Sequence, residues 1–214
     1  MSTWQIDLLE HLRARLPDAE VTAYGSATDP KLLDRWSDLD VAMSLHDSIE
    51  LEALIDTPLW AFQETSEGAT QIVRAVLADG RRVDLTVQGA SAELPRAPID
   101  NAIRFDAALA AVRFGRGNDL IGLHLTLGIL REALVQSMIS ADREHGRSHH
   151  RYATIFDPRA EEALAVLRPP SGPRTALSAY AVYARWRQEL EPDYEPAPEG
   201  LEALIESGEG RRLL

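Results

Sequence analysis

The fold is decided by a stretch that reads Val21-Thr22-Ala23-Tyr24-Gly25-Ser26 and continues, after a loop, as Ser37-Asp38-Leu39-Asp40-Val41. The first segment is a short strand running into a Gly-Ser turn, whose N–H groups and hydroxyl can face phosphate oxygens. The second opens a predicted strand over residues 39–45. Side chains alternate along a strand, so Asp38 and Asp40 are expected on the same face.

A third carboxylate lies further along the chain, in Arg82-Val83-Asp84-Leu85-Thr86-Val87. The dipeptide Asp79-Gly80 separates two β-branched runs, 70–78 and 81–88, and is a strong hairpin signal. Asp84 is therefore predicted in the middle of a strand next to the other two aspartates. Three carboxylates together are hard to hold without a cation, and Mg²⁺ prefers such ligands together with substrate phosphates.

This arrangement resembles the nucleotidyltransferase superfamily that includes DNA polymerase beta and the aminoglycoside nucleotidyltransferases. The matching residues are Gly25, Ser26, Asp38, Asp40 and Asp84, and they have the right types in the right order. The resemblance implies an α+β fold, with a small mixed-sheet nucleotidyltransferase core followed by a C-terminal helical bundle. It also implies Mg²⁺ as cofactor and a nucleoside triphosphate, ATP being the expected one, as substrate.

Roles follow from the same resemblance. Asp38 and Asp40 are metal ligands, and Asp84 is either a ligand or the group that takes the acceptor's proton. Gly25 and Ser26 hold the β- and γ-phosphates.

Two loop residues join the candidate nucleotide site. Ser37 either orients the loop through local hydrogen bonds or contacts a phosphate. Members of the family often carry Ala-Arg-Gly shortly after the Gly-Ser, whereas this chain has Ala27-Thr28-Asp29. Arg35 is the candidate to replace the missing arginine.

The hydropathy pattern changes near residues 89–100, which predicts a nucleotidyltransferase domain over 1–95 and a helical acceptor-binding domain over 96–214. The predicted elements of the first half are a helix over 6–16, strands over 21–24 and 39–45, a helix over 48–55 opened by a Ser cap, and the hairpin. The second half has predicted helices over 101–114, 118–144, 157–167, 174–190 and 201–206. The predicted apolar face of the long helix consists of Leu120, Leu123, Leu127, Leu130, Leu134 and Met138.

The helical half is also similar to bacterial nucleotidyltransferases related to aminoglycoside and lincosamide resistance enzymes. In those families an acidic residue of the helical domain can serve as base, which makes Glu132 a further candidate catalytic residue. Glu144 is a weaker candidate for the same role or for binding acceptor ammonium groups. His124 and Arg131, seven residues apart, share one helix face, and Glu132 lies beside that face. The pair His149-His150 is interpreted as part of a loop rather than a metal site.

The amino-acid composition limits the classes of partner and site that this protein can have. The 214 residues carry 22 basic and 34 acidic side chains, a net charge of −12, which argues against a nucleic-acid partner and is compatible with a cationic, hydroxylated small-molecule acceptor. The absence of cysteine excludes disulfides and thiolate sites. The N-terminus has no signal-peptide pattern and the chain has no membrane-spanning run, so a cytoplasmic protein without a membrane partner is expected, as a monomer or homodimer.

Three hypotheses follow. The first is adenylyl transfer to an aminoglycoside-like antibiotic. The second keeps nucleotidyl transfer but gives it a protein or RNA acceptor, as in antitoxin-like enzymes; Arg143 and His149 have the Arg-x(4–6)-His spacing of their partner toxins. The third is a nucleotide-binding protein that has lost catalysis.

Overall fold

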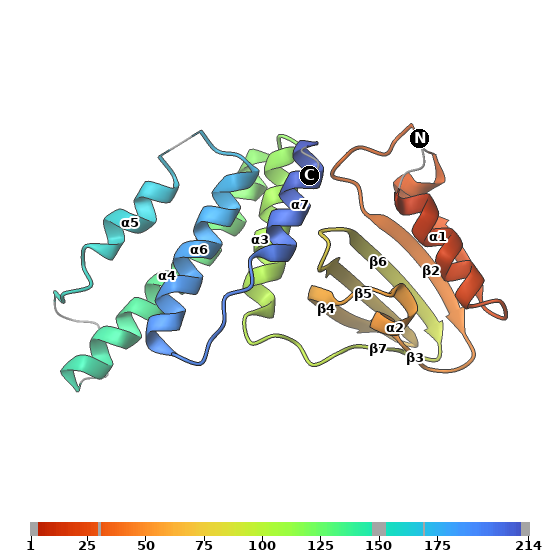
Figure 1. The fold of residues 1–214 in the computed structure, drawn as a ribbon, viewed down its shortest axis with the longest axis horizontal. Coiled ribbons are helices and arrows are strands. Elements are labelled where there is room, and N and C mark those ends of the chain that lie inside the picture. The colour runs from red at the N-terminus through yellow and green to blue at the C-terminus, as the bar shows by residue number, and fades with distance from the viewer. Residues whose placement is uncertain (1–3, 30, 147–152, 169, 211–214) are drawn as a thin grey trace. The chain divides into compact units, whose positions relative to one another are not determined.

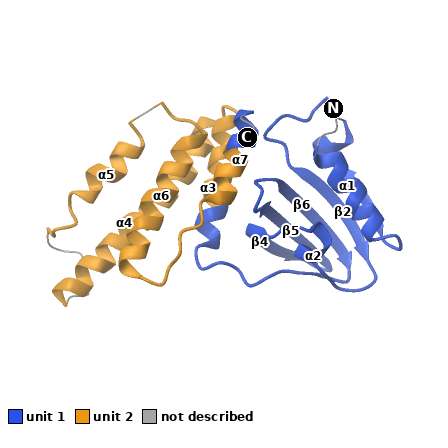
Figure 2. Ribbon diagram, viewed as in Figure 1, with its two compact units in different colours: residues 1–105, 206–214 blue, residues 106–205 orange. Residues whose placement is uncertain are grey.

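The computed structural model describes residues 4–29, 31–146, 153–168 and 170–210 (Figure 1). The chain forms two compact units, Met1–Phe105 with Glu206–Leu214, and Asp106–Ile205 (Figure 2). The α+β class expected from the sequence is confirmed, with a mixed sheet in the first unit and helices in the second. The domain division at residue 95 remains a prediction.

The first unit is built on a five-stranded sheet. Its strands lie in the order β1 (Glu20–Tyr24), β2 (Leu39–Leu45), β6 (Arg82–Gly89), β5 (Thr70–Leu77) and β4 (Leu59–Glu67). The β2–β6 pair is parallel and the other pairs are antiparallel. A second, two-stranded sheet pairs β3 (Ile49–Glu50) with β7 (Ala92–Glu93).

One face of the five-stranded sheet packs against helices α1 (Trp4–Arg15) and α2 (Leu51–Ile55). Alternate residues of β2 and β6 supply its apolar surface, and Val41, Val83 and Leu85 are completely buried there. Because side chains alternate along each strand, the residues between them, which include Asp40 and Asp84, lie on the opposite face. The apolar core therefore determines which side chains the sheet presents on its other face.

Two details of this unit differ from the sequence prediction. The helix expected over 48–55 begins only at Leu51, after the extended residue Glu50, because the preceding residues pair as β3 and leave Ser48 with no capping role. Strand β4 was not predicted at all. It begins with four consecutive buried residues, and a register shift lies between Leu59 and Ala61, so its sequence lacks the alternation that signals a strand.

Strand β4 is an edge strand, and Asn101 protects part of its open edge. The Asn101 side chain accepts a hydrogen bond from Phe62 N at 2.9 Å and donates one to Phe62 O at 2.7 Å. One amide side chain thus occupies the backbone donor and acceptor of Phe62 that a further strand would pair with.

The helices predicted in the second half are confirmed. They are α3 (Asn101–Gly115), α4 (Asp119–His145), α5 (Arg159–Val166), α6 (Pro173–Leu190) and α7 (Glu199–Glu209). Helices α4, α5 and α6 pack on one another in the second unit, where the large aromatic side chains of Tyr180, Tyr183 and Trp186 are almost completely buried.

The predicted apolar face of α4 is only partly correct. Leu130 is buried and Leu123 and Leu134 are half-buried, but Leu120, Leu127 and Met138 are exposed. The buried positions of the helix are Gly122, Thr126, Ile129, Leu130, Ala133, Ser137 and Ala141. Most of these side chains are small, and a Cβ on Gly122 would lie 2.9 Å from the ring of Phe114. The need for close approach between helices therefore outweighs the hydrophobicity of the leucines.

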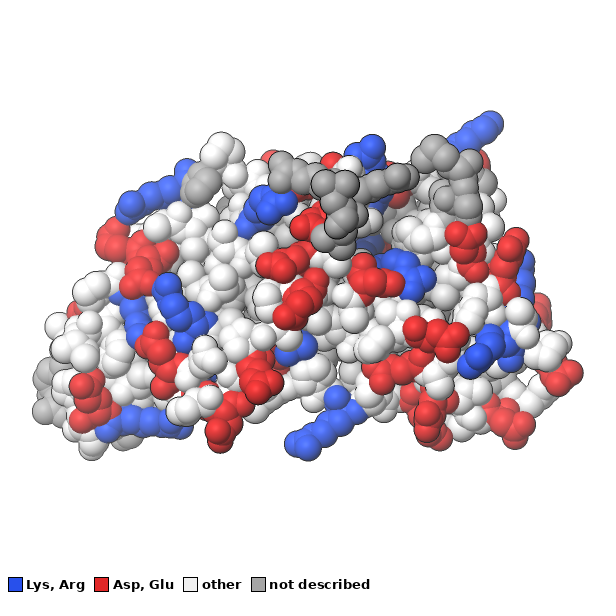
Figure 3. All heavy atoms as spheres, viewed as in Figure 1, with Lys and Arg blue, Asp and Glu red and all other residues white. Residues whose placement is uncertain are grey.

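On the face of the molecule seen in Figure 3, acidic and basic side chains are interspersed. Among the described residues, no helix is both long enough and apolar enough to span a membrane.

Candidate metal and nucleotide site

The register of two parallel strands brings the predicted carboxylates together. Asp40 on β2 lies opposite Asp84 on β6, and both side chains lie on the face away from α1 and α2. Asp38 immediately precedes β2. One carboxylate oxygen from each of the three aspartates lies within 4.8 Å of the other two.

This cluster suits a hard divalent cation. All three ligand groups are carboxylates, the donor type that Mg²⁺ takes, and none is fully buried, which leaves room for water or phosphate oxygens in further positions. The described residues thus offer three anionic oxygens for a metal ion.

Asp84 is the member of the cluster whose pKa is shifted most clearly from its ordinary value. Burial, followed by the negative charge of Asp38, raises its pKa from 3.8 to about 6. The positive charges of Arg82 and Arg74 oppose this rise without cancelling it. A bound cation would oppose it further, because it favours the ionised form of each carboxylate.

Two arginines that sequence reasoning missed contact the cluster. Arg82 Nη2 donates to Asp38 Oδ2 at 2.9 Å and to Trp36 O at 3.0 Å, and its side chain is only 10% exposed. Arg74 Nε lies 3.6 Å from Asp84 Oδ2 and its side chain is largely exposed. Both positions could have been found from the hairpin: Arg82 is two residues before Asp84 on one strand, and Arg74 pairs with Asp84 across β5 and β6.

The Gly-Ser turn lies directly against Asp40. Gly25 begins a short 3₁₀ helix (Gly25–Thr28) at the end of β1 and has a φ of +62°. A Cβ at this position would lie 2.4 Å from Asp40 Oδ2. Glycine is therefore required both for the left-handed conformation and for the close approach of the turn to the carboxylate. Ser26 follows in the same turn, half-buried.

The loop before the aspartates is held by its own hydrogen bonds. Ser37 is buried, its Oγ accepts from Asp34 N at 2.9 Å and donates to Asp34 Oδ1 at 3.0 Å, and Trp36 N donates to the same Oδ1 at 2.7 Å. Arg35 Nη1 donates to Glu209 O at the end of α7, at 3.4 Å. These bonds give Ser37 an orienting role, and the phosphate contacts expected of Ser37 and Arg35 remain predictions.

The candidates from the helical half lie in the second unit. Glu132 is on α4, where its Oε1 accepts from Arg131 Nη2 at 2.7 Å. Burial raises the pKa of Asp106 on α3, and His124, on the same helix as Glu132, opposes this rise without cancelling it. The role of Glu132 as a base or ammonium ligand remains a prediction, as does that of the exposed Glu144. His149 and His150, and with them the spacing from Arg143, lie outside the described residues.

No family model matches the chain, and no curated protein matches it. Several solved structures are similar to it. An aminoglycoside 6-adenyltransferase from Bacillus subtilis has 11% identity and a TM-score of 0.34, with 99% of each chain covered. Cid1, an RNA terminal uridylyl transferase, has 17% identity and a TM-score of 0.28, and the match covers 78% of this chain and 49% of the Cid1 chain. The polymerase core of the RNA surveillance complex TRAMP has 12% identity and a TM-score of 0.25, with 94% and 53% covered.

All three TM-scores are below 0.5, so the proposed function rests on the arrangement of the carboxylates.

The first prediction concerns the contact between Gly25 and Asp40. In Gly25→Ala the new methyl group displaces the Asp40 carboxylate, so Mn²⁺ binding followed by electron paramagnetic resonance is expected to weaken at least about tenfold, equivalent to about 1.4 kcal/mol. Gly68→Ala is the matched control, since Gly68 has a φ of +63° and a Cβ there meets nothing within 4 Å. Both variants should lose about 1–2 kcal/mol of unfolding free energy from the backbone conformation. Equal Mn²⁺ affinity in the two variants would contradict the assigned contact.

The second prediction concerns pH. The pKa of Asp84 in the folded protein, about 6, lies above the value of 3.8 for a free side chain. Its contribution to stability is therefore full below pH 3.8 and is lost as the pH rises through 6. In metal-free protein, Asp84→Asn should gain stability relative to the native protein between pH 4 and pH 8, by up to about 3 kcal/mol. Urea unfolding across this range measures the difference, and a difference independent of pH would refute the raised pKa.

Proposed function

We propose that the protein is a Mg²⁺-dependent nucleotidyltransferase that transfers a nucleoside monophosphate, AMP from ATP, to a hydroxyl of a small molecule and releases pyrophosphate. The observation that carries the proposal is the convergence of Asp38, Asp40 and Asp84 within 4.8 Å beside the Gly25 turn. The acceptor proposed is an aminoglycoside-like antibiotic or a similarly hydroxylated cationic metabolite.

The transfer forms one bond and breaks another. The acceptor oxygen bonds to the α-phosphorus, the bond from that phosphorus to the bridging oxygen breaks, and pyrophosphate leaves with the electron pair. The acceptor proton must move to a base. When bound, Mg²⁺ would polarise the phosphate and favour ionisation of the attacking hydroxyl.

Residues of the first unit are proposed to bind the metal ion and the phosphates. Asp38 and Asp40 would hold the metal ion, and Arg82 keeps the Asp38 carboxylate oriented through its hydrogen bond at 2.9 Å. The backbone of Gly25 and Ser26 would bind the β- and γ-phosphates, with Arg35 as a further candidate phosphate contact. Arg74, largely exposed beside Asp84, is also free to reach a phosphate oxygen.

Asp84 is the candidate for the proton transfer. Asp84 lies among the proposed ligands of the metal, where the attacking hydroxyl would be held. In the metal-free protein its pKa of about 6 also makes it a stronger base than an ordinary aspartate, and a bound cation would reduce that difference. The alternative is that Asp84 serves only as a ligand and that Glu132 of the helical unit takes the proton. Mutant kinetics separate these roles.

The third prediction tests the proposed activity. Pyrophosphate release from ATP, GTP, CTP and UTP is measured with Mg²⁺ and a panel of aminoglycosides and lincosamides. Asp38→Ala and Asp40→Ala should each reduce the acceptor-dependent rate by at least about 100-fold, because each removes a proposed metal ligand. Asp79→Ala is the control, since Asp79 is an aspartate of the β5–β6 turn that pairs with Arg81 outside the cluster.

The outcomes separate the competing functions. Release that depends on the acceptor and vanishes only in the two site variants supports the proposal and identifies the substrate class. Triphosphate binding that requires Mg²⁺ without release for any small acceptor would favour a protein or RNA acceptor. Absence of triphosphate binding would favour a protein without catalysis.

The fourth prediction separates the two roles of Asp84. If Asp84 is the base, Asp84→Asn lowers kcat by about 100-fold or more while the dissociation constant of the triphosphate stays within about twofold. If Asp84 is a metal ligand, kcat falls and the dissociation constant of the triphosphate rises by comparable factors. The matched variant Glu132→Gln should leave kcat unchanged in the first case, and a large loss of kcat in Glu132→Gln alone would move the base to the helical unit.

A further inference from the structure

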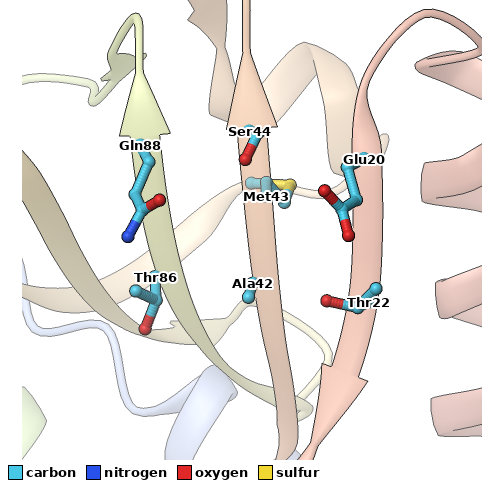
Figure 4. Close-up of a pocket in the computed structure, with 7 residues that line it drawn as sticks. All are labelled: Glu20, Thr22, Ala42, Met43, Ser44, Thr86 and Gln88. Carbon is cyan, nitrogen blue, oxygen red and sulfur yellow. The ribbon is translucent and has the colours of Figure 1, made fainter.

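The open face of the sheet continues beyond the carboxylates as a cavity of about 200 Å³. Its lining comes from three neighbouring strands, with side chains of Glu20 and Thr22 on β1, Ala42 and Ser44 on β2, and Thr86 and Gln88 on β6 (Figure 4). All of these residues belong to the first unit, so the cavity is formed by the sheet itself.

Strand register places the cavity next to the metal cluster. Tyr24, Asp40 and Asp84 form one row across the three strands. The next row towards the cavity is Thr22, Ala42 and Thr86, followed by the row Glu20, Ser44 and Gln88. Successive rows on one face are about 7 Å apart, because each residue advances a strand by about 3.3 Å. The cavity therefore begins one row from the carboxylates.

Two features shape the part of the cavity nearest the cluster. Ala42 lies between Thr22 and Thr86, and its short side chain leaves open space above the sheet in the middle of that row. Tyr24 Oη and Thr86 Oγ1 form a hydrogen bond of 3.1 Å, which joins the carboxylate row to the cavity wall. A molecule held in the cavity would extend towards Asp84 along this hydrogen-bonded edge.

The lining has a specific polarity. Hydroxyl groups of Thr22, Ser44 and Thr86 and the amide of Gln88 can each donate and accept hydrogen bonds. The charged group in the lining is the carboxylate of Glu20, and neither lysine nor arginine lines the cavity. Within the described part of the chain Glu20 has no ion-pair partner, and in Figure 4 its side chain lies across from Gln88 with Ser44 between them. This lining suits a hydroxylated molecule with a positive charge and disfavours phosphates and other anions.

The size of the cavity sets a further limit. Sites for drug-sized ligands are typically about 300–1,000 Å³. A cavity of about 200 Å³ accommodates one ring of such a molecule, with the remainder outside.

We propose that this cavity is the acceptor subsite of the nucleotidyltransferase. It holds one polyhydroxylated ring of the acceptor, with an ammonium group of that ring against Glu20. The part of the acceptor outside the cavity carries the reacting hydroxyl towards Asp84, two rows or about 14 Å further along the strands. The inference rests on the proposed function, and it assigns the acceptor to the sheet face at Glu20, Ser44 and Gln88. The triphosphate belongs at the Gly25 end, because Glu20 would repel its phosphates.

The test uses two single-ring probes, 2-deoxystreptamine, a diamino-cyclitol, and myo-inositol, a neutral cyclitol of the same ring size. Binding of each to the protein is titrated by NMR. Glu20→Gln should weaken 2-deoxystreptamine about fivefold, the effect expected for losing one accessible ion pair, and leave myo-inositol within about twofold. Glu67→Gln, an exposed glutamate of β4 outside the cavity, is the matched control and should change neither.

A second variant tests the cavity without changing charge. In Ala42→Leu the larger side chain occupies the open space between Thr22 and Thr86. It lies on the face of the sheet opposite the apolar core. Both probes should bind at least about tenfold more weakly, while ATP affinity and the melting temperature stay close to those of the native protein. Loss of ATP affinity in this variant would assign the cavity to the nucleotide and overturn the proposal.

The failure of this inference and that of the proposed function give different results. If 2-deoxystreptamine does not bind, or binds equally to the native protein and Glu20→Gln, the acceptor subsite is refuted. It is also refuted if pyrophosphate release occurs with an acceptor whose KM is unchanged in both cavity variants. If release is absent with every acceptor but Glu20-dependent binding persists, nucleotidyl transfer to these acceptors is refuted and the ligand chemistry of the cavity is supported.

Discussion

Like-charge repulsion among three aspartates is the constraint on which the site depends. Oxygens of Asp38, Asp40 and Asp84 within 4.8 Å of one another repel, and partial burial of Asp84 adds a desolvation cost. The chain offsets this cost locally with two guanidinium groups, a nearly buried one on Arg82 and an exposed one on Arg74. Their different exposure matters, because the buried pair fixes the position of Asp38 whereas Arg74 can exchange its partner for an incoming anion at little cost.

The repulsion can be sustained only because the opposite face of the sheet is rigidly specified. Val41, Val83 and Leu85 are fully buried against the α1 and α2 side of the sheet. A slip of one residue between β2 and β6 would bring these apolar side chains to the open face and bury the aspartates. The free energy that holds the carboxylates together is thus supplied mainly by apolar packing behind them.

The sequence predicts the features that depend on local pattern. The β-branched runs on either side of the Asp79-Gly80 turn identified β5 and β6 as a hairpin, and the spacing of the aspartates predicted the cluster. Features that depend on tertiary packing were missed or wrong. Strand β4 has a bulge and no alternation, and the buried face of α4 is selected by close helix approach at residues such as Gly122. The bond from Arg35 to Glu209 joins residues 174 positions apart, a separation for which the sequence offers no signal.

The pairing of β2 with β6 also has a consequence for how the protein folds. Strands β4, β5 and β6 are consecutive and antiparallel, so short turns connect them, whereas Asp38 and its partner Arg82 are separated by 44 residues. Closing that long segment is entropically costly, and contacts of this kind slow folding. The hairpins can therefore form before β2 docks on β6. A chain at that stage of folding has three of the five strands in place but no cluster of carboxylates, so binding of the proposed cation would report that folding is complete.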